Sequence, residues 1–252
     1  MTLNLIEALK PELPARVAVV GAGGKTTSLF QLANQVDGLA WVTTTTHFGT
    51  DQLDLADRHF FVNSIEELEI EQYKNQKVTL ITGPYTKDNR VNGPVSEILE
   101  KLTKIADKEK ISLFIEADGA RSFPVKAPAE HEPAIPLWVD HVIVVVGLSV
   151  LGKPFNHQWV HRPEYFARIT HLKEGEIITI ESVGDMLVHP AGGLKNIPIQ
   201  AQKVALINQA DNVEILAEAR KVVPKLLDGG FDKVIIGSLR KAPHALERYS
   251  RV

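Results

Sequence analysis

The chain has 252 residues, of which 44% are apolar, so it is long enough to bury a large core and is not expected to be disordered. Lys and Arg total 28 against 31 for Asp and Glu, which gives no reason to expect nucleic acid or an anionic membrane as a partner. Cysteine is absent, which excludes disulfides, thiol nucleophiles and Cys-based metal sites. No stretch approaches the roughly 20 apolar residues of a membrane span, and no signal peptide is visible, so we expect a cytoplasmic protein.

Short runs rich in Val and Ile predict strands that are covered on both faces. These runs are 17–20, 39–42, 78–81, 113–115, 142–146, 204–207 and 234–236. Segments of helical period lie between them, at 26–35, 64–71, 95–108 and 212–223, the last bounded by Pro224. The alternation predicts an α/β, P-loop NTPase-like fold with a mainly parallel sheet flanked by helices on both faces. We expect one domain over residues 1–252, with an irregular insertion at about 147–202.

The first predicted strand leads into G-A-G-G-K-T-T at 21–27, where the first predicted helix begins. In this context backbone N–H groups and the helix N-terminus can point at phosphates, so the sequence predicts a loop that binds Mg²⁺ with ATP or GTP. The lysine would bridge the terminal phosphates, and the first threonine would join the Mg²⁺ shell. The expected nucleotide contacts from this loop are Gly21, Gly23, Gly24, Lys25, Thr26 and Thr27.

The spacing of this loop is tighter than the common G-x-x-x-x-G-K-T, whose first glycine would fall at Val19. The short form resembles the loop of the Mur ligases and, more loosely, the loops of metallochaperone-type NTPases. The alternative is a glycine-rich turn between strand and helix that binds no ligand.

The second predicted strand is followed by T-T-T-T-H at 43–47, at the strand end where open α/β sheets bind ligands. A hydroxyl of Thr45 or Thr46 is therefore a candidate contact for Mg²⁺ or for the γ-phosphate, with Thr45 as the expected metal ligand. The alternative is that the threonines only extend the strand, which they favour.

The strand predicted at 113–115 ends in Glu116 and Asp118, whose side chains can point to the same side because one residue separates them. This is the form of a Walker B element. One carboxylate would hold Mg²⁺ or its waters, and the other would orient an attacking water, so both are candidate catalytic and metal-binding residues together with Lys25. The alternative is that the acids cap the next turn.

The strand predicted at 204–207 leads into N-Q-A-D at 208–211, which matches the guanine-recognition pattern N-K-x-D except at Gln209. Asp211 could accept hydrogen bonds from the N1–H and the exocyclic amine of guanine, which adenine does not present, and Asn208 would support it. The alternative is that Asn208 and Asp211 cap the helix that begins near residue 212. The segment at 234–239 could supply a further loop near the base.

A proline-rich polar segment follows the two acids, and Arg121, Lys126 and His131 within it could bind a second, anionic substrate. The alternative is a surface loop of mixed charge. A second cluster comprises His157, His161 and Arg162, which we interpret as a solvated loop rather than a set of metal ligands.

The motifs at 21–27 and 43–47, E-A-D-G-A-R at 116–121, K-A-P-A-E-H-E-P at 126–133 and the late N-Q-A-D together resemble the YqeC family. The matching pieces run from about Val17 to Leu239, nearly the whole chain. Members of this family are described as accessory proteins of selenium-dependent molybdenum hydroxylases. The resemblance implies a P-loop NTPase-like fold and a role in making or delivering a molybdopterin or selenium species to a client hydroxylase.

Three hypotheses follow. The first is an NTPase that drives maturation of the client, with slow hydrolysis until the client completes the site. The second is a Mur-like ligase or kinase that phosphorylates a cofactor precursor. The third is a scaffold that binds nucleotide and transfers cofactor without turnover.

Overall fold

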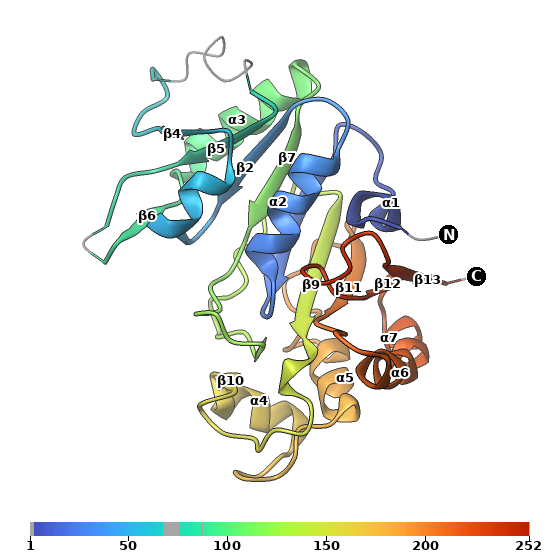
Figure 1. The fold of residues 1–252 in the computed structure, drawn as a ribbon. Helices are drawn as coiled ribbons and strands as arrows, with labels where there is room; N and C mark the ends of the chain where they lie inside the picture. The colour runs from blue at the N-terminus through green and yellow to red at the C-terminus, as the bar shows by residue number, and fades with distance from the viewer. Residues whose placement is uncertain (1–2, 68–75, 87, 252) are drawn as a thin grey trace.

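The computed structural model describes residues 3–67, 76–86 and 88–251, and its centre is a nine-stranded sheet (Figure 1). The strand order is β13-β12-β11-β9-β1-β7-β2-β5-β4, and every pair is parallel except β12 with β13. The strands are β1 (Arg16–Gly21), β2 (Ala40–Thr44), β4 (Arg58–Phe61), β5 (Val78–Thr82), β7 (Ser112–Glu116), β9 (His141–Gly147), β11 (Gln202–Asn208), β12 (Lys233–Ile236) and β13 (Glu247–Ser250). The seven predicted strands are all present, and the α/β prediction with a mainly parallel sheet is confirmed.

Both faces of the sheet are covered, because successive side chains of a strand point to opposite sides. In β1, Val17 and Val19 pack with the helices α1 and α2, whereas Ala18 and Val20 pack with α3, α5 and α7 on the other face. Figure 1 shows α2 lying across one face, close to β7. The helices are α1 (Leu5–Leu9), α2 (Lys25–Gln35), α3 (Ser96–Lys108), α4 (Pro163–Thr170), α5 (Ile180–Val188), α6 (Val213–Lys221) and α7 (Val223–Asp228).

Smaller elements join the loops at the carboxyl edge of the sheet. The strands β8 and β10 form a parallel pair in which Lys126 lies opposite His161, and β3 and β6 form an antiparallel pair. These strands are β3 (His47–Gly49), β6 (Arg90–Asn92), β8 (Val125–Lys126) and β10 (Val160–His161), and the loops also contain the 3₁₀ helices η1 (Thr50–Leu55) and η3 (Leu148–Val150).

The parallel strands bring the predicted motifs to one edge of the sheet. In the register of the sheet, Glu116 at the end of β7 lies opposite Val19 of β1 on one side and Thr44 of β2 on the other. On the far side of β1, Asn208 at the end of β11 pairs with Gly147 of β9. The glycine-rich loop, the threonines, the acids and the N-Q-A-D segment therefore meet at the carboxyl ends of neighbouring strands.

Two of the predicted helices differ from those in the structure. The helix predicted at 64–71 is not seen at 64–67, which form bends and turns, and the remainder lies outside the described residues. The helix predicted to end before Pro224 ends at Lys221, and Pro224 lies in the first turn of α7, where its missing N–H costs nothing.

Segment 147–202, where we expected an irregular insertion, contains η3, β10, α4 and α5. Among the described residues, no helix has both the length and the apolar character of a membrane span.

Candidate functional site

The glycine-rich loop between β1 and α2 has a backbone that only glycine suits. Gly21, Gly23 and Gly24 have φ values of 94°, 80° and 137°. A Cβ on Gly21 would lie 2.2 Å from the Val145 carbonyl oxygen, and one on Gly23 would lie 2.4 Å from the Gly147 nitrogen. The loop is therefore pressed against β9 and can present its backbone to a ligand without side chains in the way.

The backbone N–H groups at the N-terminus of α2 receive no hydrogen bond acceptor from the side chain of the N-cap residue. Gly24 is the N-cap residue and provides no side-chain hydrogen bond, so the first-turn N–H groups rely on other acceptors. The aligned peptide dipoles add positive potential at this end of the helix. This end of α2 is thus suited to an anion.

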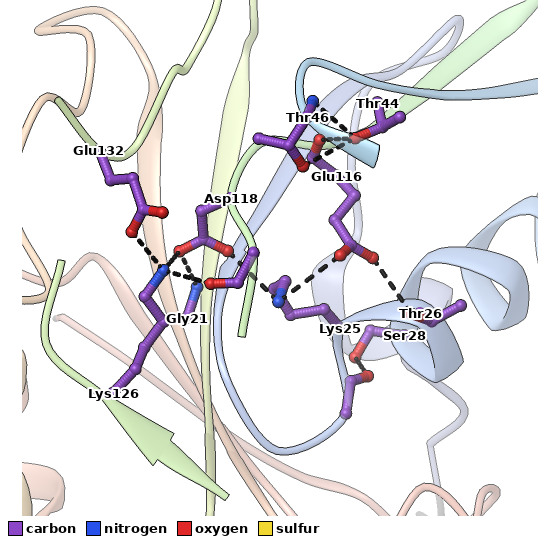
Figure 2. Close-up of polar contacts among 12 residues, drawn as sticks. Gly21, Lys25, Thr26, Ser28, Thr44, Thr46, Glu116, Asp118, Lys126 and Glu132 are labelled. Carbon is purple, nitrogen blue, oxygen red and sulfur yellow. Dashed lines mark hydrogen bonds and ion pairs between the residues drawn. The ribbon is translucent and has the colours of Figure 1, made fainter. Parts of the chain in front are cut away.

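Lys25, the first residue of α2, is buried, and its ammonium lies between the two strand-end acids (Figure 2). Its Nζ is 3.6 Å from Glu116 Oε1 and 3.4 Å from Asp118 Oδ1. The Gly21 N–H donates to Asp118 Oδ2 over 2.9 Å. The predicted loop lysine and the predicted Walker B acids therefore form one cluster.

The charges of this cluster stabilise one another. Burial alone would lower the pKa of the Lys25 ammonium, but Glu116 and Asp118 outweigh it and raise that pKa above its usual value. Burial raises the pKa of the Glu116 carboxyl above its usual range, although Lys25 opposes this. The buried ammonium is therefore held in its charged form, which is the form that binds phosphate.

Threonine hydroxyl groups from α2 and from the end of β2 lie around Glu116. The Thr26 hydroxyl donates to Glu116 Oε2 over 3.1 Å, and the Thr44 hydroxyl donates to the Glu116 carbonyl over 2.8 Å. Within the described part of the chain, the Thr45 hydroxyl is buried and has no hydrogen-bond partner. Thr46 instead donates its N–H to the Thr44 hydroxyl over 2.9 Å. Thr27 is half-buried in the first turn of α2.

The oxygen atoms around Glu116 are of the kind that would hold a Mg²⁺ ion bound to phosphates. The part of the chain that the structure describes holds no group of three or more His, Asp or Glu side chains that could bind a metal unaided. Mg²⁺ bound with phosphates, however, needs only one or two protein carboxylates and keeps several waters. The hydroxyl of Thr26, the carboxylate of Glu116 and the unpartnered hydroxyl of Thr45 are ligands of the kind that this ion prefers.

A chain of alternating charges runs from Asp118 away from Lys25. The buried Lys126 ammonium lies 2.9 Å from Asp118 Oδ2 and 2.7 Å from Glu132 Oε2. Arg162 donates to both oxygens of Glu132, over 2.8 Å from Nη2 to Oε1. Although burial opposes it, Arg162 and Lys126 lower the pKa of Glu132 to about 2. We call the five residues Lys25, Asp118, Lys126, Glu132 and Arg162 the buried charge chain.

The buried charge chain changes the interpretation of two predicted clusters. Lys126 is buried and paired with two carboxylates, whereas Arg121 and His131 are exposed, so the three predicted substrate contacts differ sharply in their surroundings. The interpretation of Arg162 as part of a solvated loop is wrong, because its guanidinium is bound to Glu132. The β8–β10 pairing that brings Arg162 there involves only two residues per strand, too few for a sequence pattern.

The side of the loop facing β11 is fixed by Asn208, which is buried. Its Nδ2 donates to the Gly23 carbonyl over 2.8 Å, and its Oδ1 accepts from the Leu239 N–H over 3.0 Å. Gln209 turns its side chain to Gly23 and Ser149. Asn208 therefore joins the glycine-rich loop to the loop that follows β12.

Asp211 lies nearby and faces the loop after β12. Its Oδ1 accepts from the Ser238 hydroxyl over 2.6 Å, and its Oδ2 is 3.3 Å from Lys241 Nζ. The residue that caps α6 is Asn212, whose side chain accepts from the Ile215 N–H. The alternative in which Asn208 and Asp211 cap this helix is therefore wrong.

A small cavity of about 20 Å³ lies beside Asp118 and is also lined by Gly21, Lys126, Met186 and Gly193. This volume admits about one water molecule. This cavity is therefore too small to hold a nucleotide.

The chain has an α/β, P-loop NTPase-like fold, with a glycine-rich loop, a buried lysine and two strand-end acids at the carboxyl ends of its central strands. The family description "YqeC protein" matches residues 17–164, which include the loop, both acids and Arg162. The chain is also 30% identical over 247 residues to "Uncharacterized protein YqeC" of Escherichia coli (strain K12), covering 94% of this chain and 92% of that protein. The chain belongs to the YqeC family, as its motifs predicted. No solved structure matches it.

Proposed function

We propose that this protein binds the triphosphate of a Mg²⁺–nucleotide at the glycine-rich loop and hydrolyses it. The observation that carries the proposal is the buried Lys25 ammonium, held at the N-terminus of α2 by Glu116 and Asp118. A cation at a helix N-terminus next to a loop of glycines is an arrangement suited to phosphates, because positive charge, the helix dipole and backbone N–H groups converge there.

The two acids have different surroundings, which supports different roles. Glu116 contacts the Thr26 hydroxyl, and its carbonyl accepts from the N–H of Thr45, whose hydroxyl has no partner among the described residues. We therefore assign Glu116, with these two hydroxyls, to the Mg²⁺ shell. Asp118 is held by the Gly21 N–H and by Lys126, so we assign it to positioning the loop and Lys25. Bound Mg²⁺ would neutralise the charge that develops on the transferring phosphate.

We infer from the family resemblance that hydrolysis serves the maturation of a selenium-dependent molybdenum hydroxylase. A Mur-like ligase would need a second anionic substrate on Arg121 and Lys126, and the pairing of Lys126 with Asp118 and Glu132 argues against this. Hydrolysis should be slow in the isolated protein and faster with the client, because switch-type NTPases depend on a partner to complete the site.

The test is phosphate release from Mg²⁺–ATP and Mg²⁺–GTP by the wild type and by Glu116→Gln, with and without a molybdenum hydroxylase. Loss of an electrostatic contact to the transition state should lower turnover by about 100-fold or more. The matched control Glu100→Gln, on the exposed face of α3, should keep the wild-type rate. Equal rates for Glu116→Gln and wild type, or no nucleotide-dependent release with the client present, would exclude hydrolysis at this site. Unhydrolysed bound nucleotide would favour the scaffold.

A further inference from the structure

Two loops at the carboxyl edge of the sheet meet beside the glycine-rich loop, and both are fixed to it. Asn208, which follows β11, bonds to the Gly23 carbonyl and to the Leu239 N–H in the loop after β12. It is only 5% exposed, and Gly24 packs so closely on it that a Cβ there would lie 2.2 Å from Asn208 Nδ2. Groups on these two loops therefore hold a fixed position relative to the proposed phosphate site.

Asp211 is the acid on this fixed platform that a ligand can reach. Its side chain is 34% exposed, whereas Ser238, which donates to its Oδ1, is buried. The helix that follows does not use the carboxylate, because Asn212 caps α6. Among the described residues, the other partner of Asp211 is Lys241, whose side chain is 65% exposed. An ion pair at such exposure contributes little, so Lys241 can release Oδ2 to another donor.

We propose that Asp211 reads the base of the bound nucleotide and selects guanine. This inference rests on the proposed nucleotide binding. Guanine presents two neighbouring donors, N1–H and the exocyclic amine, which match the two oxygens of a carboxylate. Adenine presents an unprotonated N1, which repels a carboxylate and leaves it without donors. Each carboxylate oxygen accepts two hydrogen bonds, so Oδ1 can keep its bond from Ser238 while it binds the base.

Ser238 is a positioning residue in this scheme. Its hydroxyl fixes the plane of the carboxylate, and the same hydroxyl accepts from the Lys241 N–H over 3.2 Å, which fixes the hydroxyl in turn. Loss of this hydroxyl should weaken guanine binding and leave adenine binding unchanged. A residue with a merely structural role would change both nucleotides alike.

The experiment measures by calorimetry the affinity of the protein for the Mg²⁺ complexes of GTP, ITP, XTP and ATP. The wild type should prefer GTP to ATP by about 10- to 100-fold, the range expected for a carboxylate that lacks donors. ITP, which lacks the exocyclic amine, should lie between them. Asp211→Asn should weaken GTP binding and strengthen XTP binding by at least about 10-fold, because the amide can donate to the 2-carbonyl of xanthine while accepting from N1–H.

The matched control is Asp228→Asn, an exposed acid at the end of α7, which leads to the opposite edge of the sheet. It should keep the wild-type order of affinities. Ser238→Ala should lower GTP affinity only. A gain of XTP binding by Asp211→Asn cannot arise from misfolding, so it supports the proposal directly.

The outcomes also separate this inference from the proposed function. If the wild type binds nucleotides through Lys25 but does not prefer GTP, or if Asp211→Asn leaves the order unchanged, base reading by Asp211 is refuted and the phosphate site stands. If no nucleotide binds, both proposals fail.

Discussion

The sharpest structural prediction concerns the packing of the glycine-rich loop on β9, tested by Gly21→Ala against Gly38→Ala. Both glycines have positive φ, 94° and 88°. A Cβ on Gly21 would lie 2.2 Å from the Val145 carbonyl oxygen, whereas one on Gly38 would meet no atom of the described chain within 4 Å. The pair therefore separates backbone strain from steric exclusion.

The expected magnitudes follow from this difference. Left-handed backbone costs an alanine about 1–2 kcal/mol, which is the full effect expected for Gly38→Ala. Gly21→Ala adds displacement of the β9 backbone, about 1–3 kcal/mol, for a total of about 2–5 kcal/mol. Denaturant unfolding at constant m-value measures both changes in the free energy of unfolding. Gly21→Ala should also weaken nucleotide binding, because the Gly21 N–H holds Asp118. Equal destabilisation by the two substitutions would refute the close contact with β9.

Two further predictions concern the titrating groups. Glu132→Gln should destabilise the protein by about 3–5 kcal/mol, because it leaves the buried Lys126 and the bound Arg162 with less compensation. In the wild type the pKa of Glu132 is about 2, below its usual 4.5. Its contribution to the free energy of unfolding is therefore complete above pH 4.5 and is lost as the pH falls toward 2. Urea unfolding between roughly pH 5 and 3 should show that the free energy of unfolding depends less on pH in the variant than in the wild type. Burial and Lys233 lower the pKa of His141 from 6.5 to about 4, so the unfolded state binds the extra proton and stability falls as the pH drops from 6.5 to 4. His141→Gln should reduce this dependence of the unfolding free energy on pH by about 1.4 kcal/mol per pH unit at most. A control substitution at an exposed histidine should leave the dependence unchanged. If His141→Gln also leaves it unchanged, the assignment of this effect to His141 is wrong.

The sequence predicts the centre of this fold well because its strands are covered on both faces. Each Val- and Ile-rich run became a strand, and the acids at 116 and 118 met Lys25 because parallel strands end at one edge of the sheet. The short strands β3, β6, β8 and β10 were not predicted, since two or three residues carry no readable period. The edge strands β4 and β13 are partly exposed and also lack a continuous apolar run.

The site was predictable where it depends on strand ends and unpredictable where it depends on loop pairing. The link from Lys126 through Glu132 to Arg162 joins segments far apart in the chain, and no spacing indicates it. For Asp211, the sequence left capping and base reading equally open. The structure removes the first alternative, because Asn212 supplies the cap and Ser238 binds the carboxylate.

The most direct test of the central claim is the affinity of Mg²⁺–ATP and Mg²⁺–GTP for the wild type, Lys25→Met and the control Lys104→Met, which lies on the exposed face of α3. We predict that at least one nucleotide binds the wild type and the control with a Kd well below 1 mM. Lys25→Met should weaken that binding by about 10- to 100-fold, since a charge-assisted bond to phosphate contributes roughly 1.5–3 kcal/mol. Circular dichroism would verify that the variant is folded. Wild-type binding no tighter than about 1 mM, or equal affinity in folded Lys25→Met, would contradict the assignment of the glycine-rich loop as a triphosphate site.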